Sequence, residues 1–129
     1  MKYMYTAVIS CDTTGKYIAT VPDISGCITT GNDLSDAIQQ ITDALSACLL
    51  VYEDEDIPAP APCSQEELSH ASGDYLTLIQ VDTISYRART DTKCVRRNVS
   101  IPAWLNHLAD KRGVNCSRVL QEALTQMFS

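Results

Sequence analysis

The segment 94–128 has the pattern of one short strand and two helices, and it is too short to enclose a hydrophobic core of its own. Residues 95–101 alternate in polarity and stop at Pro102, which suits the first turn of a helix. One helix is expected over 102–112, closed by Gly113 as its C-cap, and a second over 115–128. Units below about 40 residues usually need disulfides, a metal or a partner to be stable. We therefore expect this module to fold as a pair of copies.

The predicted strand at 95–101 needs a second strand, because a lone strand leaves its backbone N–H and C=O groups unpaired. Two copies that pair these strands antiparallel would form a two-stranded ribbon, which fits the major groove of DNA. The segment resembles the ribbon-helix-helix repressors in the order and length of its parts. These parts are the strand, Pro102, the first helix, Gly113-Val114, the Asn115-Cys-Ser117 cap and the second helix. The resemblance implies a homodimer that binds operator DNA, and it leaves open whether dimers pair into tetramers.

Alternation divides the strand at 95–101 into two faces. One face carries apolar side chains that we expect in the dimer core: Val95, Val99 and Ile101. The other face carries the groups with which the family contacts bases: Arg96, Asn98 and Ser100. Alternation sends Arg97 inward, and we expect this side chain to bend out toward phosphate. The resemblance also implies that Asn115 and Ser117, beside the unpaired N–H groups at the start of the second helix, hold a phosphate.

Residues 1–82 have the pattern of a β-β-β-α-β unit. Strands are expected at 3–10, 16–21 and 27–30, with the turn Asp12-Thr-Thr-Gly15 between the first two. Apolar residues then recur at helical spacing from Leu34 to Tyr52, with Asn32 or Asp33 as N-cap. An acidic, Pro-rich loop is expected at 53–62, followed by a short helix over 64–69 and a fourth strand at 75–81.

A distinctive motif spans residues 17–37. It reads YIATVPDISGCITTG over 17–31, followed by LSDA over 34–37 at the start of the helix, and it resembles the signature of the HicB antitoxins. The resemblance implies a partial RNase H-like fold and a protein partner, a small basic HicA-type toxin that cleaves mRNA and is neutralised by binding. It also implies that the complex represses its own operon. We therefore predict an α+β chain with a HicB-like toxin-binding domain at 1–82, a linker at 83–93 and a ribbon-helix-helix domain at 94–129.

The charge is distributed unevenly between these parts. Residues 1–82 contain two lysines and thirteen Asp and Glu, a net charge of −11, whereas residues 83–129 carry a net charge of +5. The basic end suits nucleic acid, and the acidic body should attract a basic partner. Its exposed carboxylates are candidate toxin contacts: Asp33, Asp36, Asp43 and the cluster 53–56. Residue by residue, a solvated face explains these charges equally well.

Enzymatic activity is not expected. Asp12 and Asp23 lie at turns, but neither begins a cluster of carboxylates of the kind that two-metal hydrolysis needs. Asp23 is expected to shape its own turn by bonding to backbone N–H groups. The six cysteines lie at least 15 residues apart, so we expect reduced and mostly buried thiols, no metal site and no cofactor.

Two alternatives remain open from the sequence. The first is a stand-alone ribbon-helix-helix regulator whose N-terminal domain senses a small ligand or oligomerises, and the second is a metal-dependent nuclease. The N-terminus lacks the pattern of a secretory signal, and no apolar run reaches the roughly 20 residues of a membrane helix. We therefore expect a cytoplasmic protein that does not interact with membranes.

Overall fold

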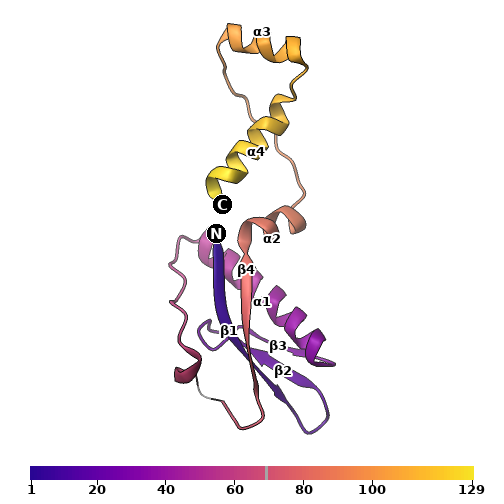
Figure 1. The fold of residues 1–129 in the computed structure, drawn as a ribbon, viewed down its shortest axis with the longest axis vertical. Helices are drawn as coiled ribbons and strands as arrows, with labels where there is room; N and C mark the ends of the chain where they lie inside the picture. The colour runs from indigo at the N-terminus through magenta and orange to yellow at the C-terminus, as the bar shows by residue number, and fades with distance from the viewer. Residues whose placement is uncertain (69) are drawn as a thin grey trace.

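The computed structural model describes residues 1–68 and 70–129, and it shows an α+β body from which two helices project (Figure 1). Four strands form one antiparallel sheet in the order β3-β2-β1-β4: β1 (Lys2–Cys11), β2 (Tyr17–Thr20), β3 (Ile28–Gly31) and β4 (Tyr75–Asp82). The helix α1 (Leu34–Asp54) follows β3, so the predicted β-β-β-α-β order is confirmed. The predicted strand ends differ from the observed ones by at most one residue.

The hairpin between β1 and β2 is built around Asp12. One of its carboxylate oxygens accepts hydrogen bonds from the backbone N–H of Thr14 at 2.9 Å and of Lys16 at 3.0 Å. The hydroxyl of Thr14 donates to the same oxygen at 2.7 Å, and Gly15 supplies the left-handed backbone with φ of 86°. These bonds lower the pKa of Asp12, with the Thr14 hydroxyl contributing most. Asp12 therefore shapes the turn that sets the strand register.

One face of the sheet packs against α1, and the core lies between them. The helix buries its apolar stripe (Ala37, Ile41, Leu45 and Leu49) against side chains from all of β1, β2 and β4. Asp33 caps its N-terminus, accepting a hydrogen bond from the N–H of Asp36 at 2.7 Å, which confirms one of the two predicted caps. The helix runs two residues beyond Tyr52 and ends where Asp56 adopts a left-handed backbone (φ 55°).

The glycine and alanine of the 17–37 motif lie in contact. A Cβ placed on Gly31 would come within 2.6 Å of the Cα and 2.9 Å of the Cβ of Ala37. The end of β3 can therefore approach the first turn of α1 this closely only if position 31 has no side chain. This contact explains why that spacing of Gly and Ala marks the fold.

The Pro-rich segment after α1 runs along the body as an extended strap and reaches η1, a 3-10 turn at Gln65–Glu67 (Figure 1). The Tyr5 hydroxyl donates to the carbonyl of Pro60, and Ala59 packs against the core. The backbone N–H of Cys63 donates to Asp23 at 3.2 Å and its thiol at 2.7 Å. The prediction that Asp23 bonds to its own turn is therefore wrong, because its carboxylate binds the strap instead. The expected end of the short helix at Ser69 lies outside the described residues.

Residues 83–90 were expected in a linker but form the helix α2 (Thr83–Thr90). Asp82 caps this helix by accepting the N–H of Ile84 at 3.1 Å, and Thr83 is fully buried. After it, residues 91–102 carry neither helix nor strand. The chain then forms α3 (Ala103–Arg112) and α4 (Cys116–Phe128), both within one residue of the predicted bounds.

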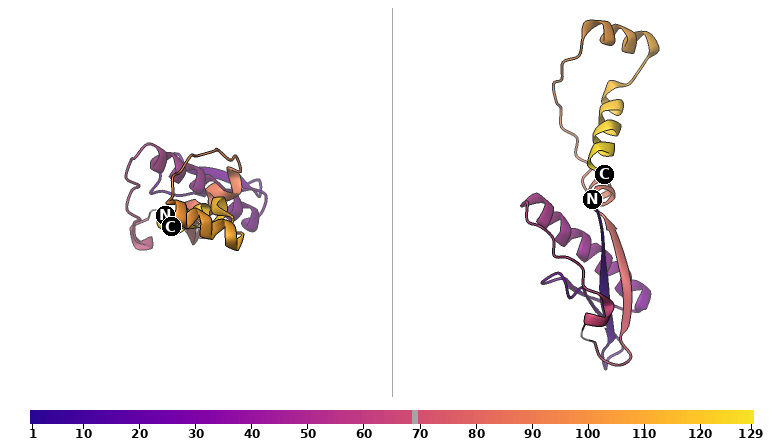
Figure 2. Two further views of the ribbon diagram at one scale, coloured as in Figure 1. Left: turned by 90° about the horizontal axis from the view of Figure 1, so that it is seen from above. Right: turned by 60° about the vertical axis from the view of Figure 1, so that its left-hand side comes forward.

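The two C-terminal helices project away from the sheet. In Figures 1 and 2, α3 lies at the far end of the molecule and α4 runs back toward the body, so that the two chain ends lie close together. Gly113 joins the helices in the predicted left-handed conformation, with φ of 64°. Within the described residues, no helix combines the length and apolarity that a bilayer crossing needs.

The expectation that the six cysteines are mostly buried is wrong. Cys27 is buried and Cys48 is half-buried, whereas the other four are exposed: Cys11, Cys63, Cys94 and Cys116. Burial raises the pKa of the Cys27 thiol to about 12, and the neighbouring Cys48 adds to the effect. The exposed thiols lie on the hairpin end, the strap and the C-terminal module, where the single chain offers little packing.

Candidate functional site

The C-terminal module exposes an unusual amount of apolar surface. No residue of α3 or α4 is buried. Trp104 is 66% exposed, Phe128 is 64% exposed, and the predicted core residue Val95 is 83% exposed. Further apolar side chains are uncovered on the same module: Val99, Ile101, Leu105, Leu108, Val114, Val119, Leu124 and Met127. A monomeric domain rarely exposes so many large apolar side chains, so this exposure is what a module that pairs with a partner surface would show.

The predicted base-reading residues lie in the segment between α2 and α3. Arg96, Arg97, Asn98 and Ser100 are all exposed, and their segment pairs with no strand among the residues that the structure describes. A ribbon made from two copies would supply that partner, so the pairing of residues 95–101 remains a prediction.

The N-terminus of α4 is capped by Asn115, whose side-chain oxygen accepts a hydrogen bond from the backbone N–H of Arg118 at 3.2 Å. Ser117 is exposed in the first turn of the same helix. The first N–H groups of any helix lack partners within the helix and can bind an anion. The structure therefore brings both predicted phosphate-binding residues to one helix end, with part of the Asn115 side chain already used for capping.

The three predicted toxin contacts have different structural roles: two belong to the N-terminal cap of α1, and the third lies farther along the helix. Asp33 and Asp36 belong to the N-terminal cap, and Asp36 also accepts a hydrogen bond from the N–H of Asn32 at 2.9 Å. Asp43 lies two turns farther along and approaches Arg89 of α2 at 3.9 Å, a distance typical of a weak surface pair. Two of these three carboxylates thus already stabilise the helix that carries them.

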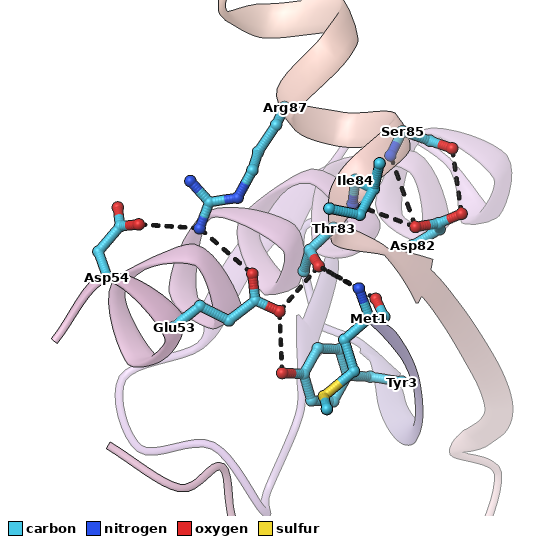
Figure 3. A network of polar contacts seen from close by, with 9 residues as sticks. All are labelled: Met1, Tyr3, Glu53, Asp54, Asp82, Thr83, Ile84, Ser85 and Arg87. Atoms are coloured by element: carbon cyan, nitrogen blue, oxygen red, sulfur yellow. Dashed lines mark hydrogen bonds and ion pairs between the residues drawn. The ribbon is translucent and has the colours of Figure 1, made fainter. Parts of the chain in front are cut away.

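The acidic cluster 53–56 is partly internal. Figure 3 shows Glu53 at the centre of a network that joins α1, β1 and α2. Its carboxylate accepts hydrogen bonds from the Thr83 hydroxyl at 2.8 Å and the Tyr3 hydroxyl at 3.0 Å, and it pairs with Arg87 at 3.2 Å. Asp54 pairs with the same guanidinium at 2.8 Å. Two members of the cluster therefore hold α2 against the body, and Glu55 and Asp56 are exposed.

This network shifts the acidity of its members. Burial disfavours the charged form of Glu53, but the bonds from Thr83, Tyr3 and Arg87 outweigh it and lower its pKa. Burial, reinforced by the bond to Glu53, raises the pKa of Tyr3 to about 12. The pKa of Arg87 is raised, chiefly by its bond to Asp54. Glu53 is therefore a structural anion at neutral pH.

The carboxylates that a nuclease would use are committed to the fold. Asp12 holds the β1–β2 turn and Asp23 holds the strap. Within residues 1–68 and 70–129, no group of three or more His, Cys, Asp and Glu side chains is placed to bind a metal ion.

Comparison with known proteins gives both a family and a set of similar folds. The profile of the family described as "HicB_like antitoxin of bacterial toxin-antitoxin system" matches residues 5–123, which include the body, α3 and most of α4. A curated relative, an uncharacterized 14.9 kDa protein of the rep-hol intergenic region of Haemophilus phage HP1, is 28% identical over 98 residues. That match covers 74% of this chain and 71% of the relative.

Among solved structures, the chain is similar to one from a toxin–antitoxin complex of Streptococcus pneumoniae, with 22% identity, a TM-score of 0.62 and coverage of 98% and 99% of the two chains. It is similar to the antitoxin HicB of Burkholderia pseudomallei, with 24% identity, a TM-score of 0.55 and coverage of 98% and 99%. The N-terminal domain of that HicB, solved separately, matches 62% of this chain and 99% of its own length, with 26% identity and a TM-score of 0.54. These similarities establish the fold, and the family is a non-enzymatic one, in agreement with the sequence. Since the family profile covers nearly the whole chain, this protein belongs to the HicB-like antitoxins of bacterial toxin–antitoxin systems.

Proposed function

We propose that this protein neutralises a HicA-type toxin by binding it and, as a ribbon-helix-helix dimer, binds operator DNA to repress its own operon. The observation that carries the DNA-binding half is the uncovered apolar surface of α3 and α4 beside an exposed segment that bears Arg96, Asn98 and Ser100. A second copy would bury that surface and would pair the two segments into a ribbon with these side chains on its outer face.

The toxin-binding half is supported by family membership and by charge. The family is one of antitoxins, and one similar chain was solved in a toxin–antitoxin complex. Once α2 is counted with the body, residues 1–90 contain four basic and thirteen acidic residues, a net charge of −9. A small basic ribonuclease would be steered toward such a body.

Co-expression with the toxin gene expected beside this one tests the antitoxin role. The neighbouring gene alone should arrest growth, and this chain should restore growth and co-purify with the toxin. A stand-alone regulator would do neither, so an unrelieved arrest would refute the antitoxin role while leaving DNA binding intact.

Substitution of the base-reading residues tests the strand register. Arg96→Ala and Asn98→Ala should each weaken specific operator binding by about 1–3 kcal/mol and leave the dimer intact. Binding to the DNA upstream of the operon can be measured by fluorescence anisotropy, with scrambled DNA as reference. Lys111→Ala on α3 is the matched control, because it removes a positive charge away from the proposed ribbon. Unchanged operator affinity in both strand variants would mean that this segment does not read the DNA.

A further inference from the structure

The face of the sheet opposite α1 has no helix over it within the described residues. The strand register places the even-numbered residues of β1 and β4 and their partners on β2 and β3 on this side. Around a buried centre at Thr6 and Val8, this face carries apolar side chains from all four strands, and we call it the open face: Met4, Ile18, Ile28, Leu76 and Leu78.

Three large apolar side chains of the open face are exposed to solvent and available for contact with a partner. Ile28 is 62% exposed, Leu78 is 58% and Met4 is 47%. In register, Met4 lies beside Gln80 and Leu78 beside Thr6, so the two exposed side chains are diagonal neighbours across β1 and β4. Among the strand residues on this side, the charged ones are Lys2 and Asp82, which lie opposite each other in the register at one end of β1 and β4. An apolar patch without carboxylates is therefore set in a body that is strongly acidic overall.

The charge of the body selects the occupant of this face. A second copy would bring another body of net charge −9 to the same place, and the two would repel each other. A net-basic protein is instead attracted by the surrounding field and can bury an apolar patch of its own against the face. Stable interfaces have such an apolar centre, whereas charges at the periphery mainly raise the rate of association.

The outer side of α1 lacks this combination. The exposed positions of α1 are Ser35, Gln39, Gln40, Asp43, Ala47, Val51 and Asp54. Val51, 55% exposed, is the one large apolar side chain among them, and Asp33 and Asp36 are used by the helix cap. The carboxylates on this side can steer a basic partner, but Val51 alone offers a smaller apolar centre than the side chains of the open face.

We propose that the toxin docks on the open face, with Met4, Ile28 and Leu78 as the exposed apolar contacts around the buried Thr6 and Val8. This inference rests on the proposed antitoxin function and specifies its surface. The sequence analysis named carboxylates on α1 as candidate toxin contacts, whereas this inference assigns the contact to the opposite side of the sheet.

The test titrates the purified toxin from the neighbouring gene into the full-length chain and measures Kd by calorimetry. The double variant Met4→Ser with Leu78→Ser should weaken binding at least roughly tenfold. Ile28→Ser, on the opposite edge of the same face, should weaken it in the same direction. Tyr75→Ser is the matched control, because Tyr75 is 49% exposed on the same strand as Leu78 but points to the side of α1, and it should change Kd less than about twofold.

Each other outcome has a distinct meaning. If the wild-type chain does not bind the toxin, the proposed function fails. If it binds and the serine variants bind equally well, the open face is not the docking site. If the double variant Asp36→Lys with Asp43→Lys weakens toxin binding more than the serine variants do, the toxin docks on α1 and not on the open face. Variants that change the oligomeric state but keep toxin affinity would show that a second copy covers this face, and would overturn the inference.

Discussion

Leu124→Arg should reduce operator affinity to the level of non-specific DNA binding, a loss of roughly a hundredfold or more. Leu124 lies on the apolar stripe of α4 and is 39% exposed in the single chain. A ribbon forms only if two copies pair, and pairing would bury this side chain against the partner's helices. An arginine there would have to be desolvated without a counter-charge, which is among the most damaging changes an interface can suffer.

The matched control for this variant is Gln121→Arg, which adds the same charge on the same helix at an exposed polar position. Gln121→Arg should remain dimeric and bind operator DNA at least as well as the wild type. Sedimentation and fluorescence anisotropy on both variants separate the two effects. A monomeric Leu124→Arg chain that kept full operator affinity would disprove the ribbon, and a dimeric one would place the pairing surface elsewhere. The body should stay folded in both, because α4 contributes nothing to its core.

The elements predicted from local patterns were found at nearly the predicted bounds. Apolar residues recur at helical spacing all along Leu34 to Leu49, and this pattern indicates a helix. Gly113 indicates the break between α3 and α4, because left-handed backbone favours glycine. These signals lie within a few turns of the residues they describe, so the sequence alone was sufficient.

The elements that depend on distant partners were not predicted. The helix α2 has only eight residues and no clear apolar period, and part of its stability comes from Glu53, thirty residues away from Thr83. Its cap could have been noticed, since Asp82 lies three residues before Ser85. Asp23 was assigned to its own turn because local bonding is the usual role of Asp there, but its partner Cys63 lies 40 residues away.

The candidate site was predictable to a similar degree. The positions of Asn115 and Ser117 at a helix start follow from local sequence and were found there. The open face could not be derived from alternation alone, because alternation shows that a strand has two sides but not which side the helix covers. The three-dimensional structure supplies that choice.

Glu53→Leu should lower the free energy of unfolding by about 3 kcal/mol. The substitution leaves the hydroxyls of Tyr3 and Thr83 without their acceptor and removes one of the two carboxylates that hold Arg87. Glu53 keeps 22% of its side chain exposed, so solvent screening moderates the ionic part of this loss. Urea denaturation followed by circular dichroism measures it. Glu55→Gln, an exposed carboxylate two residues farther on, is the control and should change stability by less than about 0.5 kcal/mol.

The same carboxylate should make stability depend on pH in the acid range. Its pKa in the folded chain is lower than the ordinary value of 4.5, so its contribution is fully present above that value and is lost as the pH falls through the folded pKa. The isosteric variant Glu53→Gln lacks this titration, so the wild type should lose more stability than the variant between neutral pH and the acid range. Asp12 and Asp82, whose pKa values are also lowered, titrate in both proteins, and the difference between the two curves isolates Glu53. Parallel curves would show that Glu53 does not act as a partly buried anion that ties α2 to the sheet, and the anchoring of α2 would then need another explanation.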